Sequence, residues 1–396
     1  MKSSFLIFFS IVLLVYTVIN FYIFRRTYSA LDGTGIYRSV FLYSFMLLVL
    51  SYPLGRIGEQ ISRNILTESL VIVGSFYLAI MVYAFLMILA IDILKLGNYF
   101  FHFFPSFMTQ NPQKTSHWTV LAGLILILFT VGAGYINTLY LRINPVTIEI
   151  PKSANGIKEL KAVVVSDIHL GTVIRSGRLL KIVEKINGLE PDIVFLPGDI
   201  VDEDVASVAE QNMSAILKNL TTRYGVFAVS GNHEYFAGME EAVSYMQEGN
   251  ITVLQDSVVK VQDAFYVAGR KDLMAERLAD GRKTLEEILS EVDKSFPVIL
   301  MDHQPYHLEI TERNGVDLQL SGHTHHGQLF PFNLITGMIY ELSWGYLKRG
   351  ETHYYVSCGV GTWGPPIRTN SVPEIVLITL RFTGKNKDLY NNRKTL

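Results

Sequence analysis

The sequence predicts a membrane protein in which apolar N-terminal helices precede one α/β domain. Of its 396 residues, 49% are hydrophobic and only 18% are charged, and a charged fraction this low indicates that part of the chain faces lipid. Residues 1–143 contain long apolar runs and are expected to form a transmembrane region. From residue 144 onward, short β-branched runs alternate with helix-like segments, which is typical of an α/β domain.

Four apolar runs are expected to cross the membrane, at residues 5–24, 39–54, 70–94 and 118–141. The first could instead be a cleavable signal peptide, but no small-residue cleavage site follows it, so we expect a retained helix. The second is short, and Pro53 is expected to mark its end. Four spans would place both termini on the same side. The lysines and arginines near the span ends are evenly divided, so they leave the orientation open.

Five segments with metal-binding side chains each follow a strand-like run of the α/β domain. In the first, residues 163–165 form a short valine run, and Asp167 and His169 follow it one residue apart. The other four segments are residues 198–202, 231–234, 302–305 and 322–326. Ligands of open α/β sheets gather at the carboxyl ends of the strands, so we expect these segments to meet there. Mixed oxygen and imidazole ligands favour Mn, Fe, Zn or Co over Mg or Ca.

The order of these motifs resembles that of the calcineurin-like metallophosphoesterase superfamily. The motifs are Asp-x-His, Gly-Asp-x-x-Asp, Gly-Asn-His-Glu, a lone His before Gln-Pro, and Gly-His-Thr-His. The similarity covers about residues 148–381 and is greatest to a membrane-associated branch with hydrophobic N-terminal segments. It implies a four-layer α/β/β/α sandwich of two mixed sheets, with the metals at the shared carboxyl edge. Residues 144–384 would form this domain, and residues 385–396 a polar tail.

The resemblance also implies a site for two divalent metal ions. The ligands it implies are Asp199 as the bridge, Asp167, His169 and His325 on the first ion, and Asn232, His303 and His323 on the second. Members of this branch often carry Gly-Gly after the last histidine, where this chain has His326 and Gly327. The spacing favours His325 as the ligand. His326 is then expected to point away from the metals or into the substrate cleft.

Three further residues are candidates for catalysis or substrate binding. By resemblance, His233 donates a proton to the leaving oxygen or stabilises the transition state, and the pKa of a histidine suits either task. Asp202 is expected to orient a histidine, with a helix N-cap as the alternative. Arg368, at the end of Gly-Pro-Pro-Ile-Arg, is expected to contact a substrate phosphate, with a surface ion pair as the alternative.

An apolar, aromatic segment follows the last histidines, at residues 329–347. One interpretation is a loop that packs on the sheet. The other is a lip that rests on the bilayer or receives an acyl chain, because aromatic residues favour the membrane interface.

The composition and the resemblance together predict the class of function. A net charge of −2 argues against a nucleic-acid partner, and the single cysteine excludes an internal disulfide framework. The resemblance implies hydrolysis of a phosphoester or pyrophosphate bond. A membrane anchor favours a phosphorylated or nucleotide-linked lipid as substrate, and some relatives are associated with UDP-diacylglucosamine hydrolysis in lipid A synthesis.

Two other functions stay open at this stage. The enzyme could be anchored at the membrane and act on a soluble phosphodiester, or the domain could serve a sensor or transporter without turnover. Against the second, all seven expected ligands and His233 are present. We expect a multi-pass protein of a bacterial inner membrane with its catalytic domain on the cytoplasmic side, and the sequence leaves the oligomeric state open.

Overall fold

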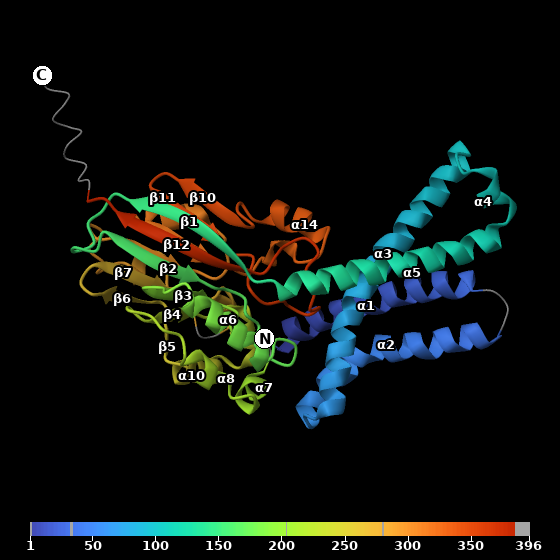
Figure 1. The fold of residues 1–396 in the computed structure, drawn as a ribbon, viewed down its shortest axis with the longest axis horizontal. Coiled ribbons are helices and arrows are strands. Elements are labelled where there is room, and N and C mark those ends of the chain that lie inside the picture. The colour runs from blue at the N-terminus through green and yellow to red at the C-terminus, as the bar shows by residue number, and fades with distance from the viewer. Residues whose placement is uncertain (1, 32–34, 203, 279–280, 385–396) are drawn as a thin grey trace, which may run out of the picture. The chain divides into compact units, whose positions relative to one another are not determined.

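The computed structural model describes residues 2–384 apart from 32–34, 203 and 279–280 (Figure 1). The expected polar tail, residues 385–396, lies outside the described residues. The chain divides into two compact units. One contains Met1–Ile136 and Gly364–Ile367, and the other contains Asn137–Trp363 and Arg368–Leu396. Each unit is described by itself below.

The first unit consists of apolar helices. Four of them are long and apolar enough to cross a membrane. They are α1 (Lys2–Ala30), α2 (Gly35–Ile61), α3 (Ile65–Phe101) and α5 (Pro112–Leu139), and the short α4 (Ser106–Gln110) precedes the last. A helix of about 20 residues spans the hydrocarbon core, so each of the four is sufficient. The prediction of four candidate spans is confirmed.

The expected end of the second span at Pro53 is wrong, because α2 continues through this proline to Ile61. Close packing on α3 accounts for the continuation. A β-carbon on Gly55 would lie 2.7 Å from the backbone nitrogen of Val71, and one on Gly74 would collide with Tyr52. Small residues let neighbouring membrane helices approach this closely, and such packing offsets the hydrogen bond that a proline removes.

The second unit contains two six-stranded mixed sheets. The first has the order β1 (Arg142–Ile150), β12 (Glu374–Phe382), β2 (Glu159–Val164), β3 (Ile193–Pro197), β4 (Val226–Val229) and β5 (Ile251–Val253). The second has the order β10 (Gly345–Arg349), β11 (Thr352–Val356), β9 (Leu318–Ser321), β8 (Val298–Met301), β7 (Phe265–Gly269) and β6 (Ser257–Val261). Strands β2 to β5 are parallel, as are β7, β8, β9 and β11.

Successive side chains of each strand point to opposite faces of the sheet, and this alternation produces the layers. In β2, Ala162 and Val164 face a core shared by the two sheets, whereas Val163 faces outward onto a second core. In β8, Ile299 faces the shared core, and Leu300 faces outward onto a third core. Alternation with a period of two is the geometry of a β-strand. Because the side chains on both faces of each sheet are apolar, helices must cover the outer face of each sheet.

Helices cover both outer faces, which confirms the four-layer α/β/β/α sandwich. On the first sheet they are α6 (Ser176–Asn187), α7 (Val205–Glu210), α8 (Met213–Leu217) and α10 (Met239–Glu248), and α12 (Leu285–Ile288) covers the second. The remaining elements are α9 (Asn232–Ala237), α11 (Met274–Arg277), α13 (Leu308–Arg313), the 3-10 turn η1 (His325–Gly327) and α14 (Phe332–Ile339). Helices α7 and α8 are separate, because Asn212 between them has a left-handed φ of 49°.

Candidate metal centre

The predicted ligands lie at the carboxyl ends of five strands, three from one sheet and two from the other. Asp167 and Asp199 follow β2 and β3, and Asn232 begins the helix after β4. From the second sheet, His303 follows β8, and the pair His323 and His325 follows β9. Parallel strands end at a common edge, so the two packed sheets bring these side chains to one place.

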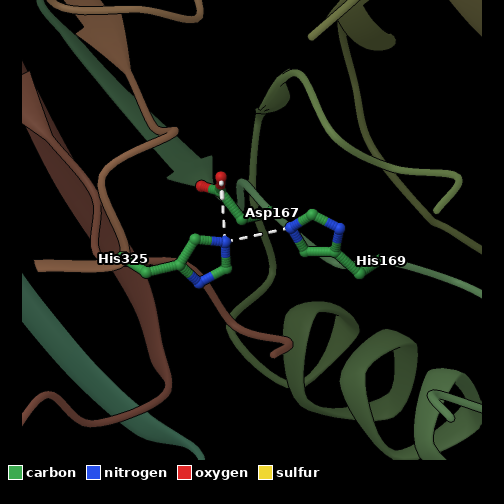
Figure 2. A group of neighbouring side chains, drawn as sticks. All are labelled: Asp167, His169 and His325. Atoms are coloured by element: carbon green, nitrogen blue, oxygen red, sulfur yellow. Dashed lines mark hydrogen bonds and ion pairs between the residues drawn. The ribbon is translucent and has the colours of Figure 1, made fainter. Parts of the chain in front are cut away.

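The first group consists of Asp167, His169 and His325, all buried (Figure 2). The Nε2 atoms of His169 and His325 are 3.0 Å apart, and Nε2 of His325 lies 3.6 Å from Oδ1 of Asp167. Three potential ligand atoms, from the turn after β2 and the turn after β9, thus point toward one another. This is the convergence that a cation requires.

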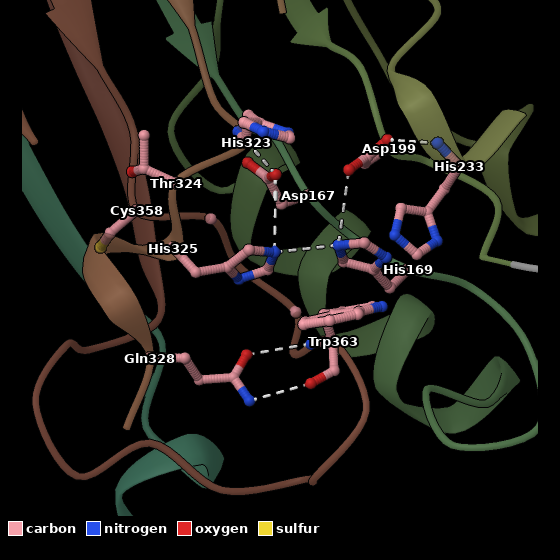
Figure 3. A network of polar contacts seen from close by, with 12 residues as sticks. Asp167, His169, Asp199, His233, His323, Thr324, His325, Gln328, Cys358 and Trp363 are labelled. Atoms are coloured by element: carbon pink, nitrogen blue, oxygen red, sulfur yellow. Dashed lines mark hydrogen bonds and ion pairs between the residues drawn. The ribbon is translucent and has the colours of Figure 1, made fainter. Parts of the chain in front are cut away.

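The second group consists of Asp199, His303 and His323 (Figure 3 shows Asp199 and His323). Oδ2 of Asp199 lies 3.1 Å from Nε2 of His303, and Nδ1 of His323 lies 2.8 Å from Oδ1 of Asn232. The same Oδ2 of Asp199 lies 3.8 Å from Nε2 of His169 in the first group. The carboxylate of Asp199 therefore borders both groups.

The donor set fits bound cations. Among the described residues, Oδ2 of Asp167 is buried and has no hydrogen-bond partner. A buried carboxylate oxygen without a partner is costly, and a cation would remove that cost. Carboxylate, amide oxygen and imidazole together are ligands for Mn, Fe, Zn or Co.

The backbone is left-handed at most of the candidate ligands. The φ angles of Asp167, His169 and Asp199 are 52°, 53° and 53°, and those of His323 and His325 are 71° and 47°. Such angles are uncommon for residues with a β-carbon and cost on the order of 1–3 kcal/mol each. The fold thus holds strained turns where the side chains must converge, and strain of this kind clusters at functional sites.

The histidines differ in protonation because their neighbours differ. Burial, followed by the positive charge on His303, lowers the pKa of His323 to about 3. Burial and the nearby His169 and Arg368 hold the pKa of His325 well below its usual range. Both rings are therefore neutral at pH 7, and a neutral imidazole is the form that binds a metal.

His233 has the opposite character. Burial alone would lower its pKa, but the carboxylates of Asp199 and Asp202 outweigh burial and raise this pKa to about 9. Its Nδ1 lies 2.9 Å from Oδ1 of Asp202, and its backbone N–H donates to Asp199 over 2.9 Å. His233 is close enough to His169 and Asp199 to join a ligand group, but its positive charge suits a proton donor better.

Asp202 contacts two histidines at once. Besides His233, its Oδ1 lies 3.2 Å from Nδ1 of His169. The alternative of a helix N-cap is wrong, because Asp204 caps α7 by accepting from the N–H of Ala206 over 2.7 Å. A carboxylate on the far nitrogen of a ligand histidine orients the ring and its tautomer.

The expectation that Arg368 lies at the surface is wrong, both as a substrate contact and as a surface ion pair. The side chain is fully buried beneath the site. Its guanidinium donates to the carbonyl of Gly361 and, over 2.7 Å, to Oγ of Ser371, and it lies 3.1 Å from Nδ1 of His325. Arg368 therefore supports the ring of His325 and is out of reach of a substrate.

His326 points away from the first group. Its φ of 47° turns the chain after His325, and its Nδ1 lies 3.1 Å from Oγ of Ser343. The ring packs near Trp344, with centroids 5.3 Å apart. His325, rather than His326, is the histidine that joins Asp167 and His169.

Glu234 lies in one of the five motif segments, but sequence reasoning gave it no part in the site. It is fully buried, and its two carboxylate oxygens accept four backbone N–H groups. The donors are the N–H groups of Asp199, Ile200, Val201 and Gly231, at 2.7–3.1 Å. A charged residue at the third position of a helix is a signal for such capping, and Glu234 occupies that position in α9.

Comparison with known proteins supports this site. Residues 160–327 match the family model described as calcineurin-like phosphoesterase. An uncharacterized metallophosphoesterase from Helicobacter pylori strain 26695 is 31% identical over 93% of this chain and 96% of its own length. One from strain J99 is 36% identical over 56% of this chain, and the match spans 60% of that relative. A zebrafish (Danio rerio) protein named transmembrane protein with metallophosphoesterase domain is 33% identical over 59% of this chain and 55% of its own.

Proposed function

Since the chain belongs to the calcineurin-like metallophosphoesterases and is a membrane protein, we propose that it hydrolyses a phosphoester or pyrophosphate bond of a lipid-linked substrate. The observation that carries the chemistry is the position of Asp199, whose carboxylate borders both ligand groups. A single carboxylate between two cation sites is what a two-metal phosphoesterase requires.

The proposed ligands would hold two divalent ions. They are Asp199 as the bridge, Asp167, His169 and His325 on the first ion, and Asn232, His303 and His323 on the second. Two such ions lower the pKa of water and stabilise negative charge on the phosphoryl oxygens.

His233 is proposed as the proton donor to the leaving oxygen. A pKa raised to about 9 keeps its ring protonated at neutral pH, and Asp202 fixes the ring from behind. A positioned acid of this kind typically contributes a rate factor of about 10²–10⁴. His326 is half-buried beside the last ligand histidine, and we propose that it lines the path of the substrate.

Two exposed aromatic side chains support an apolar substrate. The rings of Phe236 and Trp363 lie 5.6 and 6.1 Å from the ring of His233. They are 49% and 55% exposed, so they present apolar surface next to the proposed acid. Trp363 is held in place by two hydrogen bonds between its backbone and the Gln328 amide, both 3.0 Å (Figure 3). A lipid chain would cover these rings, whereas a soluble phosphodiester would leave them in water.

The test is hydrolysis by the detergent-purified full chain with added Mn, against a panel of p-nitrophenyl phosphodiesters and UDP-linked or phosphorylated lipids. Asp199→Ala removes the shared ligand, and Asp263→Ala, on an exposed turn, is the matched control. We expect activity that is lost only in Asp199→Ala, with lipids preferred. A preference for the soluble esters would replace the lipid substrate with a soluble one. No difference between the variants across the whole panel would contradict the enzyme itself.

A further inference from the structure

An exposed apolar surface lies beside the metal centre, and we propose that it inserts into the surface of the lipid bilayer. We call it the α14 face, formed by Phe330, Leu334, Ile335, Met338 and Ile339. None of the residues of α14 is buried. Met338 is 86% exposed and Leu334 60%, which is unusual for side chains of this kind outside a membrane segment.

The sequence of the α14 face is that of an interfacial segment. Residues 329–340 include no charged side chain. A helix on a surface that meets only water turns polar residues outward, and a contiguous exposed apolar patch marks an interaction surface. The half-exposed Trp344 and Tyr346 follow, and these residue types gather where membrane and water meet.

The connection between the two parts of the chain points to a bilayer as the partner. Helix α5, one of the four candidate spans, ends at Leu139, and β1 of the α/β domain begins at Arg142. An extended chain covers at most about 3.6 Å per residue, so this link reaches only about 10 Å. The domain therefore stays next to the membrane that holds α5.

The α14 face is tied to the segment that carries two of the proposed ligands. Helix α14 packs on the His325–Gly327 turn. At its end, Tyr340 accepts a hydrogen bond from Tyr306 over 3.1 Å and lies 6.1 Å from the ring of His323. Insertion of α14 would thus hold the metal centre at the level of lipid headgroups. The inference concerns attachment to lipid and does not depend on which substrate is cleaved.

The experiment uses the full chain in lipid nanodiscs with a nitroxide label at Met338→Cys. The control label is at Asp263→Cys, because Asp263 has an 86% exposed side chain on the β6–β7 turn. The native Cys358 is buried, so the unsubstituted chain serves as the labelling blank. Oxygen dissolves in lipid and a nickel chelate in water. We expect the ratio of oxygen to nickel collisions to be several-fold higher at Met338→Cys than at Asp263→Cys.

A second label tests whether apolar character is the cause. With the label at Ile335→Cys, adding Leu334→Glu and Met338→Glu should lower the collision ratio to that of the Asp263→Cys control. Nickel collisions as frequent at Met338→Cys as at the control would overturn the inference. Low collision rates with both reagents, together with spin coupling between labels, would assign the α14 face to a second copy of the chain instead and would also overturn it.

Discussion

Single side chains at the candidate metal centre take different protonation states although they lie in one cluster. His323 faces other histidines and is neutral, whereas His233 faces two carboxylates and is charged. With Asp199, Asp202 separates the two behaviours, and it contacts both His233 and the far nitrogen of His169. Its charge, rather than its shape alone, is what we expect it to contribute.

Replacing Asp202 with Asn tests that charge. The substitution removes a negative charge beside His233, so the pKa of this ring should fall from about 9 toward its ordinary value near 6.5. His233 then loses its proton at lower pH, so the alkaline limb of the kcat profile should move to lower pH. The measurement is kcat against pH at saturating metal, with Asp263→Asn as the control. An unchanged alkaline limb in Asp202→Asn would show that His233 is not the titrating acid.

At the scale of elements, Glu234 joins two strand ends that the chain leaves separate. Glu234 lies in α9, the helix after β4, yet three of its four hydrogen bonds come from backbone N–H groups of the turn after β3. That turn carries Asp199 in a left-handed conformation. The fourth hydrogen bond, from the N–H of Gly231, caps the N-terminus of α9 itself. The position of the shared ligand therefore depends on an acceptor from the neighbouring strand end.

Glu234→Gln should be strongly destabilising although it changes one atom. The amide nitrogen of Gln would face two backbone N–H groups, and each buried donor left unpaired costs about 1–3 kcal/mol. For a loss of about 3 kcal/mol, a domain of this size should melt roughly 6–12 °C lower. Thermal unfolding measures the effect, with the exposed Glu286→Gln as control. Equal melting temperatures for both variants would mean that the four hydrogen bonds do not stabilise the turn.

At the scale of the whole molecule, the proposed ligands come from both sheets. Asp167 and Asp199 belong to the first sheet, and His303, His323 and His325 to the second. Any cation that they share is also a link between the sheets. Metal binding should then stabilise the folded α/β domain as well as support the reaction.

Removing the metal should lower stability and activity together. Bound ligand at 100 times its dissociation constant adds about 2.7 kcal/mol to the free energy of unfolding, and a chelator takes this away. We expect EDTA to lower the melting temperature of the native chain, and Mn, Fe, Zn or Co to restore it better than Mg or Ca. Asp199→Ala should melt at one temperature with or without EDTA. If EDTA left the melting temperature of the native chain unchanged, this would argue against a structural metal.

Short-range patterns predicted much of this molecule, and long-range contacts explain what they missed. The strand-then-ligand pattern located the five segments that converge, since it depends only on alternation and sheet geometry, whereas the individual ligands were implied by the family resemblance. The burial of Arg368 was not predictable, because its contact with His325 joins residues 43 apart in the sequence. The passage of α2 through Pro53 likewise depends on packing against α3.

The left-handed turns also bear on how such a site would decay over evolutionary time. At Asp167, His169, Asp199, His323 and His325, a glycine would relieve the strain of the left-handed backbone. Selection for folding alone would therefore replace these residues instead of keeping them. A relative that no longer uses the centre should accumulate glycine or asparagine there first, well before its buried strands change. The five positions thus offer a way to separate active from retired members of this family by sequence.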